Sequence, residues 1–135
     1  MEKPLLIMKK GAAALLFLGV SALPMANLSA GTQSAAWEAG GDVFDTYCSD
    51  CHSLSPKGTN RKGPTLHGVM GRRAGVVGGY DYSPTMRSSG IVWSPTTLNA
   101  YLANPRAVVP GGKMKKGLQK AADRANVIVF LARPE

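Results

Sequence analysis

The longest apolar stretch of the chain lies near its start, where Gly11 to Leu23 runs almost without a polar residue. Three lysines precede this run, and small residues around Ala30 follow it. This order predicts a signal peptide over residues 1–30, cleaved after Ala26 or Ala30. Because a bilayer-spanning helix needs roughly 20 apolar residues, an uncleaved membrane anchor is the less favoured alternative. The mature protein is therefore expected in the periplasm.

Helical spacing of apolar residues recurs at both ends of the remaining chain. After a flexible start over 31–37, the positions of Val43, Phe44 and Tyr47 predict a helix from Ala39 to Cys51. A second helix is expected from Ala121 to Ala132, with an apolar face formed by Val127, Ile128, Phe130 and Leu131.

The middle of the chain alternates between loops and short helical signals. Residues 53–81 are rich in glycine, proline and lysine and predict loops. One short helix is expected within 83–88. Another begins with Ser94 as N-cap and Pro95 in its first turn, and ends before Pro105. No strand pattern is convincing, so the sequence predicts an all-α domain over 38–135 with three to five short helices and long loops.

Composition and charge narrow the setting. The chain has 135 residues and 44% hydrophobic residues, which suits one packed domain. Its sixteen basic and eight acidic residues give a net charge of +8, and removal of residues 1–30 would leave about +6. A basic exported protein is expected to meet acidic proteins or anionic membrane surfaces rather than nucleic acid.

The two cysteines, Cys48 and Cys51, belong to the sequence Cys-Ser-Asp-Cys-His at 48–52. This pentapeptide is the attachment pattern of a covalent haem. On a helical turn the two thiols share a face and can join the two vinyl groups of one porphyrin, while His52 can reach the iron as an axial ligand. Three other interpretations remain open: a redox dithiol, a structural disulfide, and a zinc site that adds His67.

An electron-transfer haem needs a sixth iron ligand, and methionine is a common one. The candidates are Met70, Met86 and Met114. Pro110, Gly111 and Gly112 precede Met114 and predict an irregular loop able to wrap over a flat cofactor. Met114 is therefore the preferred ligand, while Met70 and Met86 are expected mainly to fill the core.

A series of motifs resembles the class I c-type cytochromes, the branch of mitochondrial cytochrome c and bacterial cytochrome c2. The resemblance covers residues 38–133 and includes 48–52, Lys-Gly-Pro-Thr-Leu-His-Gly at 62–68, Gly-Tyr-Asp-Tyr at 79–82, Gly-Ile-Val-Trp at 90–93, Tyr-Leu-Ala-Asn-Pro at 101–105 and Pro-Gly-Gly-Lys-Met at 110–114. It implies the cytochrome c fold, wrapped around one covalent haem c.

The resemblance also implies roles for single residues. Cys48 and Cys51 match the thioether cysteines, and His52 and Met114 match the axial ligands. Further matching positions are Pro64, whose carbonyl would accept a hydrogen bond from the axial imidazole, Arg72, Tyr82 and Trp93 near the haem propionates, and Tyr101 near the methionine sulfur. Simple packing is the alternative for each aromatic residue.

The sequence departs from the family pattern at three places. Met86 stands where asparagine is usual, Gly112 stands where threonine is usual, and the segment Lys115-Lys116-Gly117-Leu118 lacks the usual apolar and aromatic residues. We therefore expect a less polar crevice and a less shielded haem edge.

The resulting functional hypothesis is a monomeric, soluble electron carrier of the periplasm rather than an enzyme. Its expected partners have acidic docking surfaces, such as a cytochrome bc1-type donor, a terminal oxidase, a reaction centre or a dehydrogenase. Two alternatives are a dedicated cytochrome subunit of an oxidoreductase complex, and a haem enzyme or gas-binding cytochrome with a labile sixth ligand.

Overall fold

The computed structural model describes residues 26–133, so most of the predicted signal peptide lies outside the described residues. The described part contains five helices and one isolated β-bridge, between Arg73 and Val92. The helices are α1 (Ala26–Tyr47), α2 (Pro84–Arg87), α3 (Pro95–Ala103), α4 (Pro105–Val108) and α5 (Ala121–Leu131). The all-α prediction is confirmed.

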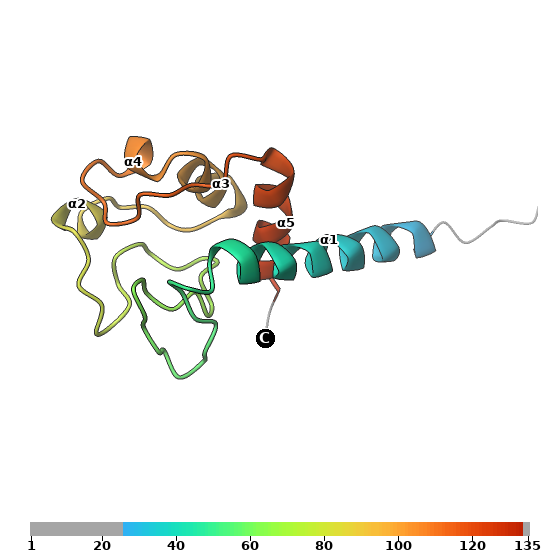
Figure 1. Cartoon of the computed structure of the whole chain (residues 1–135), viewed down its shortest axis with the longest axis horizontal. Coiled ribbons are helices and arrows are strands. Elements are labelled where there is room, and N and C mark those ends of the chain that lie inside the picture. Colours follow the sequence, from blue (N-terminus) through green and yellow to red (C-terminus); the bar gives the residue numbers. More distant parts are fainter. Residues whose placement is uncertain (1–25, 134–135) are drawn as a thin grey trace, which may run out of the picture.

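The first and last long helices cross in close contact (Figure 1). Gly40 of α1 makes this approach possible, because a methyl group there would overlap the Asn126 carbonyl and the Phe130 side chain of α5. The ring centroids of Phe44 and Phe130 lie 5.8 Å apart, and those of Trp37 and Phe130 lie 5.4 Å apart. Aromatic packing therefore joins the two ends of the domain.

The boundaries of α1 differ from the prediction at both ends. The helix begins at Ala26, not at Ala39, and residues 31–37, expected as a flexible start, are helical. Residues 31–35 are exposed, and Figure 1 shows this end of α1 projecting from the body. An exposed helix has no apolar periodicity to detect, and alanine favours it by propensity alone. At its other end α1 stops at Tyr47, and Cys48 to Cys51 form a turn.

The short helices α2, α3 and α4 each begin at a capping residue, and the predicted cap at Ser94 is present. Ser83 accepts a hydrogen bond from the Met86 amide at 3.2 Å, and Ser94 forms a capping box with Thr97. Asn104 ends α3 and also caps α4, an element that the sequence did not indicate. These capping hydrogen bonds fix where each of the short helices begins.

Buried hydrophobic residues form one cluster, and much of it surrounds a cavity. The least exposed side chains are Val127 at 1% and Val69 and Val109 at 2%. Within residues 26–133, no helix is both long enough and apolar enough to cross a bilayer.

Candidate functional site

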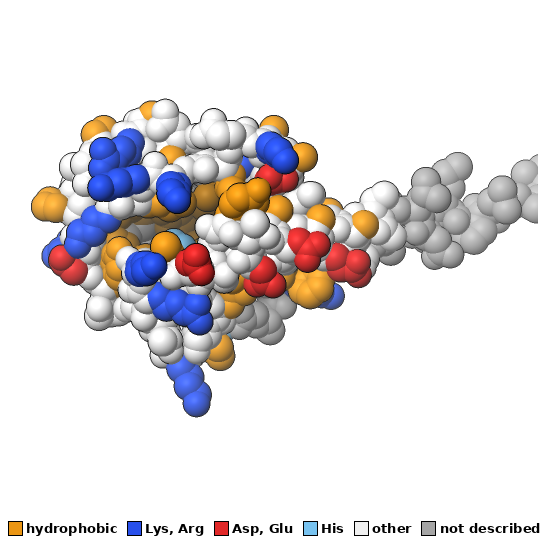
Figure 2. Space-filling model, in the orientation of Figure 1, with side chains coloured by type: hydrophobic (Ala, Val, Ile, Leu, Met, Phe, Trp, Pro, Cys, Tyr) orange, Lys and Arg blue, Asp and Glu red, His pale blue; other side chains and the backbone are white. Residues whose placement is uncertain are grey.

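A cavity of about 430 Å³ opens between the loops and helices. That volume falls in the ordinary range for small-molecule and cofactor sites, about 300–1,000 Å³. Figure 2 shows its hollow lined by hydrophobic side chains, with lysine and arginine around the mouth. All nine site residues predicted from the sequence line this one cavity: Cys48, Cys51, His52, Pro64, Arg72, Tyr82, Trp93, Tyr101 and Met114.

The two cysteines enter the cavity from the turn that follows α1. The amides of Cys51 and His52 both donate to the Cys48 carbonyl, at 3.0 and 2.9 Å, which brings the two thiols to one wall. Both thiols are free and half-buried. Burial, with a smaller contribution from the neighbouring Cys51, raises the pKa of the Cys48 thiol to about 11. A reactive dithiol needs an accessible thiolate, so this environment disfavours the redox-dithiol hypothesis.

The His52 ring is held from behind by the loop at 63–64. Its Nδ1 lies 2.7 Å from the Pro64 carbonyl oxygen. Because a carbonyl can only accept, Nδ1 must donate, and Nε2 then keeps its lone pair for a metal. Burial lowers the pKa of His52, while the bond to Pro64 raises it. A methyl group on Gly63 would overlap the imidazole, so only glycine leaves the ring its place.

Of the three candidate methionines, Met86 and Met114 line the cavity, whereas Met70 is half-buried outside its lining. Met114 follows a tight loop in which Gly111 has a φ of +77°, a value that favours glycine. Gly112 lies against Val109, where an added methyl group would stand 3.0 Å from the Val109 carbonyl oxygen. The predicted irregular loop is therefore present and brings Met114 to the cavity.

Aromatic side chains form another part of the lining. Trp93 and Tyr101 are 8% and 5% exposed, and their ring centroids lie 5.1 Å apart. Burial raises the pKa of Tyr101 to about 12, with smaller contributions from Tyr80 and Tyr82. Burial also raises the pKa of Tyr82. These phenols stay protonated and can donate hydrogen bonds into the cavity.

Arg72 lines the cavity, but its guanidinium donates hydrogen bonds to backbone carbonyls. Its guanidinium donates to the His67 carbonyl at 2.6 Å and to the Thr65 carbonyl at 2.8 Å. Burial lowers its pKa. Arg72 thus fastens the loop at 65–67 and places a positive charge beside the cavity, while its implied position near a haem propionate stays a prediction.

The structure also selects among the chemical alternatives for the cysteine motif. His67 lies outside the lining, and within the described residues no three His, Cys, Asp or Glu side chains gather as a metal site. The zinc hypothesis is therefore not supported by the fold. A flat porphyrin fits the residues present, since apolar walls, two free thiols, an imidazole nitrogen and a thioether sulfur surround one space.

Sequence reasoning missed a large part of the lining. Besides Tyr80, the cavity contacts Val127 and Leu131 of α5, which were predicted only as core residues, and three aliphatic residues that the sequence analysis did not single out: Val69, Leu98 and Leu102. Their spacing predicts burial, but burial against a cofactor and burial against a neighbouring helix leave the same pattern.

Fold and site together define a small all-α protein built to enclose one flat, covalently attached cofactor. Known proteins agree with this class. The chain is 45% identical over 96 residues to cytochrome c type-1 of Ascaris suum, a match that spans 70% of this chain and 85% of the relative. It is 44% identical over 93 residues to cytochrome c of Gibberella zeae and of Arabidopsis thaliana, with 68% of this chain and 88% and 83% of the relatives covered. No family model matches the chain.

The chain therefore belongs to the cytochrome c family. The resemblance seen in its motifs is confirmed, and so is the expected fold. Membership makes the chain an electron-transfer protein rather than an enzyme, with one covalently bound haem c as its cofactor.

Proposed function

We propose that this protein is a soluble monohaem carrier that shuttles single electrons in the periplasm, between membrane complexes of respiration or photosynthesis, or from a dehydrogenase. The observation that carries the proposal is the convergence of Cys48, Cys51, His52 and Met114 on one apolar cavity. Cys48 and Cys51 hold the haem as thioethers, and His52 and Met114 are its axial ligands. When bound, haem c supplies a one-electron ferric–ferrous couple.

The residues around the cavity favour fast electron transfer because their positions change little between the two oxidation states. The Pro64 carbonyl fixes the orientation of His52 and raises its basicity as a ligand. Trp93, Tyr101 and the aliphatic wall exclude water from the cavity, so few solvent dipoles must reorient when the charge changes.

Export rests on the sequence before Ala30. A positively charged start, an apolar run and small residues support secretion. Covalent haem attachment to the two cysteines supports it too, because bacteria complete that attachment outside the cytoplasm. Sequencing the N-terminus of the mature protein tests this directly. A first residue near 27 or 31 supports cleavage, and an intact Met1 in the membrane fraction supports an anchor instead.

Basic residues at the mouth of the cavity support an acidic docking partner. Lys62, Lys113, Lys115 and Lys116 all contribute to the lining, and Figure 2 shows lysine and arginine around the hollow. A basic rim accelerates encounter with an acidic surface of a bc1-type donor, oxidase, reaction centre or dehydrogenase. Co-purification with one such complex would instead favour a dedicated subunit.

Optical spectra of the purified protein test the central proposal. A pyridine haemochrome spectrum typical of two thioether bonds, retention of colour in acidified acetone, and the weak far-red band of methionine-ligated ferric haem are expected. Haem that washes out in acidified acetone would contradict covalent attachment. Rapid carbon monoxide binding by the reduced protein would contradict Met114 as a firm ligand.

A further inference from the structure

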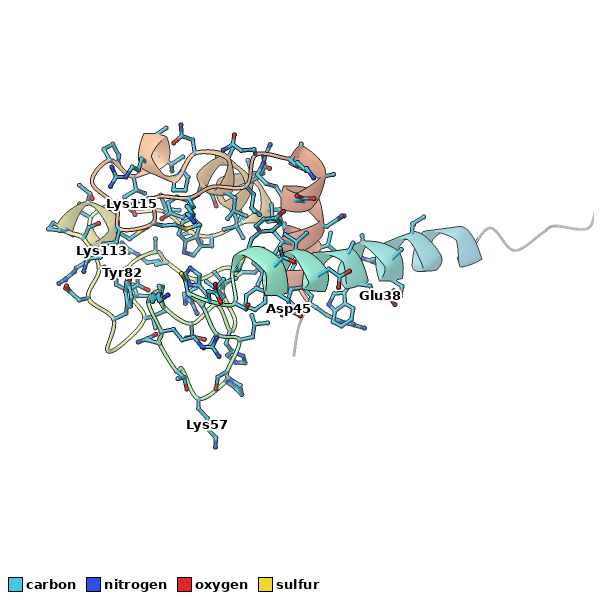
Figure 3. The ribbon with its side chains drawn as sticks, in the orientation of Figure 1. Glu38, Asp45, Lys57, Tyr82, Lys113 and Lys115 are labelled. Atoms are coloured by element: carbon cyan, nitrogen blue, oxygen red, sulfur yellow. The ribbon has the colours of Figure 1, made fainter. Side chains whose placement is uncertain are left out.

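A cluster of charges crosses from the loop at 79–83 to the segment that carries Met114. The Lys113 ammonium lies 2.6 Å from Oδ2 of Asp81 and also donates to the Asp81 backbone carbonyl. The same ammonium stands 5.9 Å from the centre of the Tyr80 ring, a cation–π distance. In Figure 3 Lys113 lies beside Tyr82 at this end of the molecule. One side chain of the Met114 segment is thus held by three groups of another loop.

Asp81 is itself held in place from α2. The Arg87 guanidinium lies 2.8 Å from Oδ1 of Asp81 and donates to the Tyr82 carbonyl from Nε at 3.2 Å and from Nη2 at 2.8 Å. Both carboxylate oxygens of Asp81 are therefore engaged, each by a different cation. An isolated exposed ion pair contributes little, but a cluster with fixed geometry is the case in which surface charges matter.

The position of Lys113 gives this cluster its significance. The segment is anchored on one side by buried Val109, whose carbonyl accepts from the Gly112 amide at 3.0 Å, and on the other by the Leu118 amide, which donates to Leu102 at 2.7 Å. Between these anchors, residues 113–117 are exposed or half-buried. Among the described residues, the hydrogen bonds made by 113–117 come from the Lys113 ammonium.

We propose that Asp81 is a positioning residue for Met114: it fastens Lys113 across the mouth of the cavity and so keeps the adjacent methionine sulfur at the iron. This inference rests on the proposed axial role of Met114. It also divides the basic rim into two kinds of residue. Lys113 is bound to Asp81 within the protein, whereas Lys115 and Lys116 are exposed and can contact a partner.

The test uses purified ferric holoprotein and imidazole, a ligand that competes with methionine for the iron. Asp81→Asn and Lys113→Gln should each tighten imidazole binding about two- to fivefold, the range of an exposed but networked ion pair. The double variant should give no more than either single change, because both remove the same link. Sodium chloride should tighten imidazole binding to the unmodified protein and not to Asp81→Asn.

Matched controls separate positioning from net charge and from fold. Asp45→Asn removes the same charge as Asp81→Asn but on α1, and Lys57→Gln removes the same charge as Lys113→Gln but at a loop tip outside the cavity lining (Figure 3). Both should leave imidazole affinity unchanged, and Asp81→Glu should restore most of the original affinity. Denaturant unfolding of each variant shows whether a change in affinity merely follows a loss of global stability.

The outcomes distinguish this inference from the proposed function. If the unmodified ferric protein lacks the far-red band of methionine ligation, the axial role of Met114 fails and the inference fails with it. If the band is present and Asp81→Asn binds imidazole like the unmodified protein, the inference alone is overturned. Equal effects of Asp81→Asn and Asp45→Asn would overturn it as well, since net charge would then explain the change.

Discussion

The wall that carries His52 and the segment that carries Met114 are built in different ways. Figure 1 shows the loops at 48–68 and the segment at 109–118 on opposite sides of the body. His52 is fixed by a hydrogen bond to Pro64 and by the bare backbone of Gly63 against its ring. Met114 depends on a glycine loop and on an exposed ionic cluster. One proposed ligand is held by buried backbone, and the other by exposed charged side chains whose attraction salt can weaken.

The first prediction compares loss of the two ligands. His52→Ala should prevent stable haem incorporation, because the imidazole and its backing at Pro64 belong to the same rigid wall. Met114→Ala should give a folded haem protein that binds carbon monoxide rapidly when reduced. Haem content per chain and carbon monoxide kinetics measure the difference. A colourless Met114→Ala protein beside a fully loaded His52→Ala protein would reverse the comparison.

The second prediction concerns the glycines of the two sides. Gly63→Ala places a methyl group in the His52 ring and should cost about 3 kcal/mol of unfolding free energy. Gly112→Ala meets the Val109 carbonyl at 3.0 Å and should cost about 1 kcal/mol, because the loop can shift.

Gly78→Ala is the control for both changes, since its added methyl group would meet nothing within 4 Å. Denaturant titration of the three holoproteins gives the order. An equal cost for Gly63→Ala and Gly78→Ala would show that the space around His52 is not fixed.

The third prediction uses pH to examine the aromatic wall between the two ligand regions. Burial raises the pKa of Tyr101 to about 12 from its ordinary value of 10.0. Between these values the unfolded chain loses the phenol proton and the folded chain keeps it, so stability is full below pH 10 and falls as pH rises toward 12. Tyr101→Phe should flatten this alkaline decline.

Thermal unfolding of the Tyr101→Phe protein and of the unmodified protein from pH 8 to 11 measures the effect. Tyr47→Phe is the control, because Tyr47 is 60% exposed. Identical alkaline slopes for all three proteins would show that Tyr101 does not carry the linkage.

The smallest expected effect concerns the rim on the Met114 side. Lys116→Gln should slow reduction of a membrane oxidase about twofold at low salt and reduce the dependence of the rate on ionic strength. Lys57→Gln removes the same charge at a loop tip far from the cavity mouth (Figure 3) and should change neither quantity. Stopped-flow measurements at several salt concentrations decide, and a rate independent of salt would contradict steering.

Local patterns predicted much of this molecule because local physics produces much of it. Ser83, Ser94 and Pro95 mark the starts of α2 and α3, and the structure places both helices there. The pentapeptide at 48–52 and the loop before Met114 predicted the residues that meet at the cavity. Each of these signals is complete within a few residues.

Other features depend on contacts that a single segment does not contain. The exposed start of α1 has no apolar face to mark it, and α4 depends on Asn104 serving two helices. Asp81 and Lys113 are 32 residues apart, and their charges gave no sign of a pairing before the loops were seen together. Val127 and Leu131 were predicted as core residues, but only the cavity shows that the core includes a cofactor wall.

The crossing of α1 and α5 has a consequence for the order in which the molecule can be assembled. Gly40 meets Asn126 and Phe130, so the contact joins residues from opposite ends of the domain. During synthesis, α1 and the cysteines emerge well before α5. Until α5 is in place, Val127 and Leu131 are missing from the lining, and the cavity is open on that side. Packing of α5 against α1 therefore completes the wall of the cavity.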